Sequence, residues 1–287
     1  MDSAVTTPST STVPTQPVRL CGGLRMRGTL ARGAPGQPLV SVITASFNAR
    51  KHIADCIQSV QLQDYRNIEH IIIDGGSIDG TVDVLRSFDK IIALWRSEPD
   101  KGIYDAWNKG LVEARGEWIC FIGADDELLP GAISAYMRLA AEYPEAEYLS
   151  SRIRYVHSSG YVNPAHGKPW SWPRFSRSMC VAHPGSMHRR SLYERLGEYD
   201  ISYRTAADYE LLLRAGAALR AAFMPAVTAT MRGGGASDRA IALKEAYRAR
   251  VITGQRNRLL ARVELWKELV KFRLLPLRRA VAVWMEP

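Results

Sequence analysis

Short apolar runs that alternate with amphipathic stretches limit what this chain can fold into more than any other feature. The runs are rich in β-branched residues and lie at residues 40–45, 68–73, 91–95 and 118–122. Between the first two runs, apolar residues recur at helical spacing, at Ile53, Cys56, Ile57 and Val60. Continuous apolar strands separated by helices are typical of a parallel sheet that helices cover on both faces. We therefore expect an α/β fold with a Rossmann-like, mainly parallel sheet flanked by helices.

The predicted strands end in polar or acidic residues. Ala45 and Ser46 end the first strand, Asp74 ends the second, and Asp125 and Asp126 follow the fourth. Open α/β folds bind ligands where the carboxyl ends of their strands meet, so these residues are expected to line one crevice. Adjacent carboxylates repel each other, and a divalent cation shared with a diphosphate would relieve the repulsion between Asp125 and Asp126. The alternative is an acidic turn that caps the next helix.

Several classes of protein are disfavoured by what the sequence lacks. Neither G-x-G-x-x-G nor G-x-x-x-x-G-K-S/T occurs, which argues against dinucleotide-binding and P-loop proteins. The four cysteines are widely spaced, without a C-x-x-C pair, as expected in a reducing compartment. No run reaches the roughly 18 apolar residues of a membrane span. We therefore expect a cytoplasmic location.

The charge of the chain is concentrated at its ends. The net charge is +9, of which residues 1–37 carry +3, residues 38–243 carry −1 and residues 244–287 carry +7. A neutral body argues against nucleic-acid binding, whereas a basic tail favours contact with an anionic surface. In the tail, apolar residues recur at helical spacing, at Leu259, Val263, Trp266 and Val270.

We expect residues 241–287 to form a basic amphipathic helical tail that breaks and restarts at residues 274–279. Such a helix either lies in a membrane interface, at the inner face of the cell membrane, or packs its apolar face on the preceding domain. Residues 1–37 are rich in Ser, Thr, Pro, Gly and Arg and are predicted to be disordered. Residues 157–178 read as a long loop, whose Trp170 and Trp172 either stack on a sugar or fasten the loop.

Five motifs in a fixed order add a family resemblance. They are Ala45-Ser46-Phe47-Asn48 after a strand, Asp74-Gly75-Gly76-Ser77-x-Asp79-Gly80-Thr81, Glu98-Pro99-Asp100-Lys101-Gly102-Ile103-Tyr104-Asp105-Ala106-x-Asn108-Lys109-Gly110, Gly123-Ala124-Asp125-Asp126 and Ala207-Asp208-Tyr209-Glu210-Leu211. This set resembles the family 2 glycosyltransferases with the GT-A fold. It looks closest to the branch that builds bacterial surface polysaccharides, O-antigens and glycolipids. The resemblance covers about residues 39–240, with residues 38–130 as the nucleotide-binding half and 131–240 as the acceptor half.

The resemblance implies roles for individual residues. Asp74 matches the acid that reads the nucleotide base. Asp125 and Asp126 match the D-x-D-type site for Mn²⁺ or Mg²⁺, with Asp126 as the main metal ligand. Asp208 matches the general base, although as a helix-start residue it is alternatively only an N-cap. Gly123 stands where many members have a further Asp, so the D-x-D pattern is incomplete in this chain.

The implied reaction is metal-dependent transfer of a sugar, with inversion, from a nucleotide-sugar, in the first place a UDP-sugar. The acceptor is a saccharide or a lipid-linked saccharide. Ala45, Ser46 and Asp105 are further candidates for contact with the nucleotide-sugar. His183 is a candidate for contact with the diphosphate or the acceptor; alternatively it is a loop histidine bonded to the backbone. Glu98 and Asp100 either shape the nucleotide pocket or cap a turn.

Two other classes of function remain open on the sequence. The first is a nucleotidyltransferase or sugar pyrophosphorylase, which shares the strand-helix nucleotide fold and the metal. Such enzymes usually carry a Gly- and Arg-rich loop after the first strand, whereas Ala45-Ser46-Phe47-Asn48 contains no glycine. The second is a non-catalytic carbohydrate-binding scaffold. The presence of both Asp126 and Asp208 argues against it, because a protein without activity needs neither.

Overall fold

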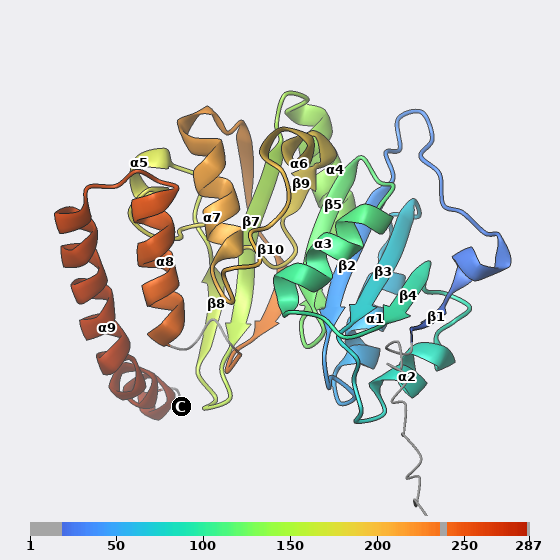
Figure 1. Cartoon of the computed structure of the whole chain (residues 1–287), viewed down its shortest axis with the longest axis horizontal. Helices are drawn as coiled ribbons and strands as arrows, with labels where there is room; N and C mark the ends of the chain where they lie inside the picture. Colours follow the sequence, from blue (N-terminus) through green and yellow to red (C-terminus); the bar gives the residue numbers. More distant parts are fainter. Residues whose placement is uncertain (1–18, 236–239, 286–287) are drawn as a thin grey trace, which may run out of the picture.

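The computed structural model describes residues 19–235 and 240–285, with side chains up to residue 274, and shows a central sheet between layers of helices (Figure 1). The strands are β1 (Leu20–Gly22), β2 (Val40–Ser46), β3 (Ile68–Asp74), β4 (Leu94–Ser97), β5 (Trp118–Gly123), β6 (Glu127–Leu128), β7 (Tyr148–Val156), β8 (Val162–His166), β9 (Met187–Arg189) and β10 (Ala221–Arg232). The helices are η1 (Leu24–Arg27), α1 (Ile53–Gln61), α2 (Thr81–Ser87), α3 (Ile103–Glu113), α4 (Ala132–Glu142), α5 (Trp172–Phe175), α6 (Arg190–Leu196), α7 (Ala207–Ala215), η2 (Gly216–Ala218), α8 (Ala240–Ile252) and α9 (Arg258–Met285).

The sheet confirms the predicted α/β class. Its strand order is β1-β4-β3-β2-β5-β9-β7-β10-β6, and β8 pairs with β7. The strands β4, β3, β2 and β5 run parallel, as do β7 and β10. The antiparallel strands β1, β6, β8 and β9 lie at the edges of, or between, these parallel groups. The third strand begins at Leu94 rather than at the predicted residue 91.

Alternate residues of the strands bury their side chains on opposite faces of the sheet. Ile43 of β2 packs with α3, α6 and α7 on one face, whereas its neighbour Val42 packs with α1 and α4 on the other. Ile72 of β3 joins α1 and α2 in a smaller cluster on that second face. Because both faces are covered, the parallel strands are largely apolar, as the sequence pattern indicated, with buried polar exceptions such as Glu69 and His70 of β3.

The register of the parallel strands places their polar ends side by side. Ser46 pairs with Asp74, and Asp74 pairs with Ser97. On the other side of β2, Ala45 pairs with Gly123, directly before the two acids that follow β5. The carboxyl ends of the central strands therefore form one polar edge, as predicted. In Figure 1 this edge faces downward, and the C-terminal end of α9 lies at the same end of the molecule.

The N-terminal segment differs from its prediction. Residues 1–18 lie outside the described residues, but the rest of the segment predicted to be disordered contains β1, which pairs with β4, and η1. Arg25 of η1 forms an ion pair of 2.6 Å with Glu69, whose side chain is fully buried. A buried carboxylate requires a positively charged or hydrogen-bonding partner. The ion pair between Glu69 and Arg25 therefore holds η1 in place, although the composition of this segment predicts disorder.

Two other segments are more regular than predicted. The expected loop at residues 157–178 contains β8, which pairs with β7, and the short helix α5. Trp170 packs its ring at 4.4 Å from that of Phe175, so this tryptophan fastens the segment to the core instead of standing free for a sugar. The helix α9 continues through Pro276 without the predicted break. A proline removes one intrahelical hydrogen bond, and in a long helix it can produce a kink without ending the helix.

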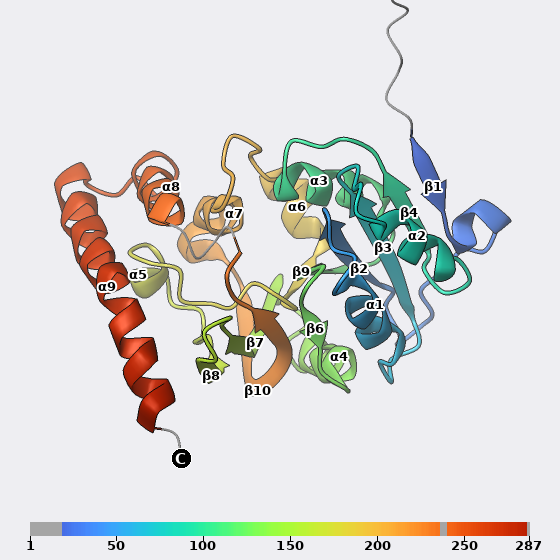
Figure 2. The same ribbon diagram turned by 90° about the horizontal axis from the view of Figure 1, so that it is seen from below.

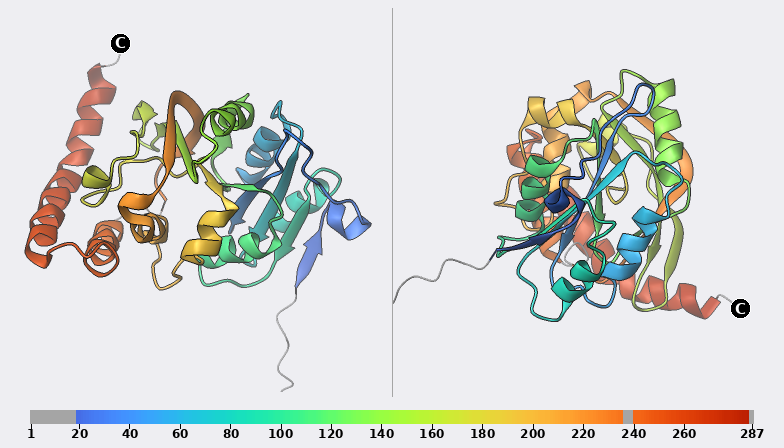
Figure 3. Two further views of the ribbon diagram at one scale, coloured as in Figure 1. Left: turned by 90° about the horizontal axis from the view of Figure 1, so that it is seen from above. Right: turned by 90° about the vertical axis from the view of Figure 1, so that its right-hand side faces the viewer.

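The two C-terminal helices form an outer layer beyond α7. α9 lies outermost and contacts α8 (Figures 2 and 3). Arg250 of α8 is fully buried and forms an ion pair of 2.9 Å with Glu268 of α9; it also donates to the carbonyl oxygen of Arg177. Within the described ranges, no helix has the length and apolar character needed to cross a membrane.

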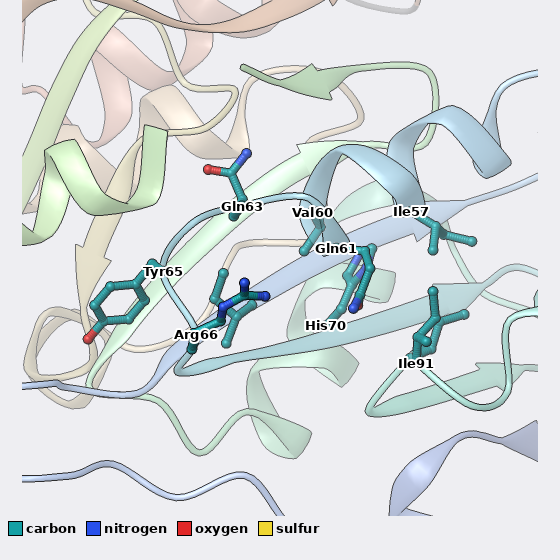
Figure 4. Close-up of a pocket in the computed structure, with 10 residues that line it drawn as sticks. Ile57, Val60, Gln61, Gln63, Tyr65, Arg66, His70 and Ile91 are labelled. Carbon is teal, nitrogen blue, oxygen red and sulfur yellow. The ribbon is translucent and has the colours of Figure 1, made fainter. Parts of the chain in front are cut away.

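A small cavity of about 90 Å³ lies toward the amino ends of the strands, away from the polar edge (Figure 4). The side chains around it come from α1 and the segment after it, β3 and the segment before β4. His70 lines this cavity and lies 3.0 Å from the hydroxyl of Thr44. Burial lowers the pKa of His70 to about 3, so the folded protein keeps this imidazole neutral at physiological pH.

His70 should make the protein less stable in mild acid. The unfolded chain binds a proton at a pKa near 6.5 and the folded chain only near 3, so stability falls as the pH falls through this window. Between pH 7 and pH 5 we expect His70 to contribute a loss of about 2 kcal/mol in the free energy of unfolding. Denaturant unfolding of the wild type and of His70→Gln at both pH values measures this share. Equal acid sensitivity of the two proteins would contradict the assignment.

Candidate active site

The polar edge of the sheet borders an open cavity of about 440 Å³, which we call the nucleotide cavity. It lies at the carboxyl end of β2 and between the segments that follow β3 and β4. Its lining residues are Ala45, Ser46, Phe47, Gly75, Asp100, Gly102 and Ile103. The predicted site residues Ala45 and Ser46 therefore face a cavity of suitable size for a small ligand.

Asp74 supports the nucleotide cavity from behind and does not line it. Its side chain is fully buried. Its carboxylate accepts hydrogen bonds from the hydroxyls of Ser46 (3.1 Å), Ser77 (2.5 Å) and Ser97 (2.7 Å) and from the backbone N–H groups of Gly76 and Ser77. Asp74 thus ties together the ends of three strands, and the predicted direct contact with a base would require its carboxylate to exchange these bonds.

Asp100 is the carboxylate that faces the nucleotide cavity. Its Oδ1 accepts the N–H of Gly102 at 2.8 Å, and Oδ2 lies above Gly75, where a Cβ would come within 2.7 Å of it. Burial raises the pKa of the Asp100 carboxyl. The sequence motif contained this residue, but its role in a turn or in a pocket was not separable there. In the structure Asp100 both accepts the hydrogen bond of the turn at Gly102 and lines the cavity, and its contact with a nucleotide stays a prediction.

A second cavity, of about 250 Å³, adjoins the first through Ile103, and we call it the aspartate cavity. It collects three acids, Asp125, Asp126 and Asp208, from the segment after β5 and from α7. His183, Arg204, Arg232 and Gly235 also line it. The fold thus brings together the candidate metal ligands and the candidate base, which lie far apart in the sequence.

Asp126 is buried rather than on the surface, with 5% of its area exposed. Its Oδ1 accepts the backbone N–H of Arg232 at 2.9 Å. Burial, together with the negative charge of Asp125, raises the pKa of the Asp126 carboxyl to about 7. The side chain of Arg232 is engaged with Glu127 at 2.7 Å. In the described part of the chain, neither Asp125 nor Asp126 forms an ion pair.

These acids suit a divalent cation that is shared with a substrate. Two neighbouring carboxylates, one of them buried and both without a cation, form a site that a positive charge would stabilise. No group of three or more His, Cys, Asp or Glu side chains among the described residues is arranged to hold a metal ion alone. Mg²⁺ and Mn²⁺ are commonly bound by one or two carboxylates together with phosphate oxygens of a substrate. The residues therefore fit a metal that binds with a diphosphate.

Asp208 is not the N-cap of α7. Ala206 occupies the N-cap, and no side chain caps the helix there. Instead, the hydroxyl of Tyr104 donates to Oδ1 of Asp208 at 3.0 Å. Burial and the negative charge of Asp208 hold the pKa of Tyr104 well above its usual value, so Tyr104 remains a donor. The structure thus contradicts the capping alternative and leaves the carboxylate of Asp208 facing the aspartate cavity.

His183 belongs to the wall of the same cavity. Its ring stacks on Trp107 at 5.1 Å between centroids, and its Nε2 lies 3.4 Å from the hydroxyl of Tyr199. Burial lowers the pKa of His183, against the opposing effect of Asp208. The neutral ring is therefore a hydrogen-bonding group of the cavity, and the structure shows its side chain paired with Tyr199 rather than with the backbone.

Asp105 lies outside both cavities. Its carboxylate accepts the N–H of Lys101 at 2.9 Å and forms an ion pair of 3.5 Å with Lys109. It lines a separate cavity of about 240 Å³ beside the N-terminus of α3. Arg204 and Arg232, which line the aspartate cavity, were not predicted, because neither belongs to one of the five motifs.

The sequence of the chain is similar to those of known proteins. Residues 41–196 match the family described as Glycosyl transferase family 2. The PGL/p-HBAD biosynthesis glycosyltransferase of Mycobacterium bovis is 30% identical over 219 residues, which are 72% of this chain and 82% of that protein.

Two solved structures share the fold. The structure of S. aureus TarS 1-349 in complex with UDP-GlcNAc aligns with a TM-score of 0.62 at 15% identity, covering 82% of this chain and 72% of that one. Mannosyltransferase PcManGT from Pyrobaculum calidifontis, in complex with GDP-Man and Mn²⁺, aligns with a TM-score of 0.60 at 17% identity, covering 92% of this chain and 86% of that one. At these identities the likeness extends to the fold.

Proposed function

Because the chain belongs to glycosyl transferase family 2 and is a glycosyltransferase, we propose that it moves a sugar from a UDP-sugar to a saccharide or lipid-linked acceptor of a surface polysaccharide or glycolipid. One observation carries this proposal: the aspartate cavity joins Asp125 and Asp126 with Asp208 and adjoins the nucleotide cavity. A donor therefore has room for its nucleoside on one side of Ile103 and for its diphosphate and sugar on the other.

The nucleotide cavity is the proposed binding site for the nucleoside of the donor. In the proposed pose the nucleoside occupies the nucleotide cavity, where Asp100 and backbone groups around Gly75 offer hydrogen bonds, while Asp74 holds the walls in place. TarS with UDP-GlcNAc and the mannosyltransferase with GDP-Man show the nucleotide-sugars that two proteins of this fold take. They support a nucleoside diphosphate as the part of the donor that the cavity holds.

The diphosphate lies, in this proposal, beside Asp125 and Asp126. Mn²⁺ or Mg²⁺ held by these carboxylates would stabilise the negative charge on the departing diphosphate. The Mn²⁺ in the mannosyltransferase complex supports a metal of this class. Arg204 also lines this cavity.

Asp208 is proposed to take the proton of the acceptor hydroxyl. Its carboxylate faces the cavity and is oriented by Tyr104. As the proton moves to Asp208, the acceptor oxygen attacks the anomeric carbon from the side opposite the diphosphate, which inverts the configuration. His183 is neutral and lines the same cavity, where it contributes a hydrogen bond and no charge.

The test is a donor screen that monitors the release of nucleoside diphosphate in the presence of Mn²⁺ and a panel of lipid-linked and soluble saccharides. We expect release from a UDP-sugar, and a product of inverted anomeric configuration by NMR. Release of pyrophosphate from a nucleoside triphosphate and a sugar phosphate would instead identify a nucleotidyltransferase. Binding of saccharides without turnover of any donor would identify a non-catalytic scaffold.

We further propose that the outer surface of α9 binds the membrane. The apolar residues singled out by their spacing are exposed, so they do not pack on the domain; with Leu274 they are Leu259 (70% exposed), Val263 (51%), Trp266 (66%), Val270 (38%) and Leu274 (49%). We call these five residues the apolar stripe. The opposite side of α9 carries Ala261, which is fully buried, and the acids Glu264 and Glu268.

The charges of α9 favour an anionic lipid surface over other occupants of the apolar stripe. Glu264 and Glu268 are held in ion pairs with Arg256 and Arg250. The basic residues Arg258, Arg262, Lys267 and Lys271 are exposed beside the stripe. An exposed apolar stripe flanked by cations is typical of helices that lie in a membrane interface. If a second copy of the chain covered the stripe, the basic residues of the two copies would lie close together and repel each other.

Vesicle binding by the full chain tests this surface. Wild-type protein should co-sediment with vesicles of phosphatidylcholine and phosphatidylglycerol, more weakly with phosphatidylcholine alone, and less at high salt. The Val263→Ser, Trp266→Ser double variant should lose roughly tenfold or more in affinity for the vesicles, because it lacks two apolar side chains that the wild type transfers from water into the membrane interface. Val112→Ser, at an exposed valine of α3, is the matched control.

Point substitutions are preferable to removal of the tail, because α9 supplies Glu268 to the buried Arg250. Without that partner a fully buried charge would remain unpaired and destabilise α8. Equal vesicle binding by the double variant and the wild type would refute the membrane role. If the wild type is a dimer by light scattering and the double variant a monomer, while both bind vesicles equally, a second copy of the chain covers the apolar stripe.

A further inference from the structure

The cavity of about 240 Å³ beside the N-terminus of α3, which we call the outer cavity, has no role in the proposed reaction so far. It is lined by residues 101–105 and by Ile201, Tyr203 and Arg204. Ile103, Tyr104 and Arg204 also line the aspartate cavity, so the two cavities share a wall. That wall includes Tyr104, which bonds the candidate base Asp208.

The outer cavity has an excess of positive charge. Lys101 and Arg204 are its cations, and across the described residues neither side chain forms an ion pair. The only acid in the lining, Asp105, is already engaged with the N–H of Lys101 and with Lys109. Two cations without ion pairs in the lining of one pocket are suited to bind an anionic group.

Arg204 is held in this position by α8. The carboxylate of Glu245 accepts the backbone N–H groups of Arg204 at 3.0 Å and of Thr205 at 2.7 Å, and the hydroxyl of Thr205 at 2.8 Å. One turn later, Arg248 donates to the carbonyl and hydroxyl oxygens of Ser202 and stacks on the ring of Tyr203. Fixing the backbone in this way lowers the conformational entropy that residues 202–205 would lose on binding a ligand.

We propose that the outer cavity binds an anionic group of the acceptor, a phosphate or a carboxylate, between Lys101 and Arg204. The inference rests on the proposed function, because it assigns the cavity to the acceptor of the reaction at Asp208. The donor's diphosphate is matched by the site at Asp125 and Asp126, on the other side of the shared wall. An acceptor anchored at Lys101 and Arg204 would place a neighbouring hydroxyl toward Asp208, so the site selects acceptors that carry a negative charge close to the glycosylated hydroxyl.

Small aromatic probes test the cavity without turnover. Binding of phenyl phosphate, benzoate and phenol is measured by ligand-observed NMR, with UDP and Mg²⁺ at saturating concentration so that the donor site is filled. We expect both anions to bind more tightly than phenol, and the tighter of the two to identify the anionic group. Lys101→Gln and Arg204→Gln should each weaken anion binding by roughly tenfold, the effect of losing one charge-assisted hydrogen bond. Lys90→Gln removes an exposed lysine elsewhere and should leave binding unchanged.

Three results would overturn the proposal. The first is equal binding of the anions and of phenol. The second is unaltered anion binding in Lys101→Gln and Arg204→Gln. The third is a loss of UDP affinity in Arg204→Gln with anion binding intact, which would assign that cation to the donor. The assay measures binding and contains no transfer step, so the two proposals can fail separately. A protein that binds the anions but transfers no sugar would contradict the proposed function and leave the anion site standing.

Discussion

We expect Asp208→Asn to lower turnover by roughly 10²–10⁴-fold, the range typical of a lost general base. Asn keeps the size of the side chain and a carbonyl oxygen that accepts the hydrogen bond of Tyr104, so the cavity keeps its shape. The amide cannot take a proton from an acceptor hydroxyl. The loss should therefore appear in kcat, while the affinity for UDP in the presence of Mn²⁺ stays within a factor of about two.

Glu198→Gln is the matched control for the charge change, because Glu198 is an exposed acid of the segment before α7. It should turn over at the wild-type rate. Tyr104→Phe separates orientation from proton transfer: it removes the donor to Asp208 but keeps the carboxylate. A loss smaller than that of Asp208→Asn is expected. Wild-type turnover by Asp208→Asn, or a product of retained configuration, would exclude Asp208 as the base.

The second large effect concerns the metal. Asp126→Asn should abolish measurable turnover and also abolish the rise in Tm that Mn²⁺ gives the wild type, because binding to the folded state alone stabilises it. Asn is a better choice than Ala at this position. It retains an acceptor for the N–H of Arg232, whereas Ala would leave that buried group unsatisfied at a cost of about 1–3 kcal/mol.

Asp55→Asn, at an exposed acid in the first turn of α1, controls for the loss of one carboxylate and should keep the response to Mn²⁺. For the wild type, EDTA should stop turnover, and Mn²⁺ or Mg²⁺ should restore it. Full turnover in EDTA would refute the metal requirement. An unchanged Mn²⁺ response in Asp126→Asn would place the metal on other residues.

The sheet and its polar edge were predictable because they depend on local patterns. Runs such as residues 118–122 carry apolar side chains on both faces, and the rule that parallel strands end at a common edge predicts that Asp125 and Ser46 lie at the same edge of the sheet. The aspartate cavity was predictable only through the family resemblance. Nothing in the spacing of residues places Asp208 beside Asp126, because that approach depends on how α7 packs on the sheet.

Other features required knowledge of partners distant in the sequence. Arg25 looked like part of a disordered, Arg-rich segment, but the buried Glu69 orders it. The apolar stripe of α9 was visible in the sequence, yet periodicity does not tell which side of a helix its neighbours cover. Asp126 looked exposed because acids usually are, and its burial depends on β10 folding over it. Each difference arises from a long-range contact that local composition does not encode.

The bonds from Glu245 and Arg248 to residues 202–205 have a consequence for chimaeric enzymes. The region matched by the family ends at residue 196, whereas both the segment and the helix that holds it follow later in the chain. A graft that exchanges residues 202–205 between relatives must therefore include α8, since the helix of the recipient lacks side chains selected to bind this backbone. The graft must also include α9, because Glu268 of α9 forms the ion pair with the buried Arg250 of α8. The part to be exchanged in a test of the proposed acceptor site is therefore residues 202–205 together with both C-terminal helices.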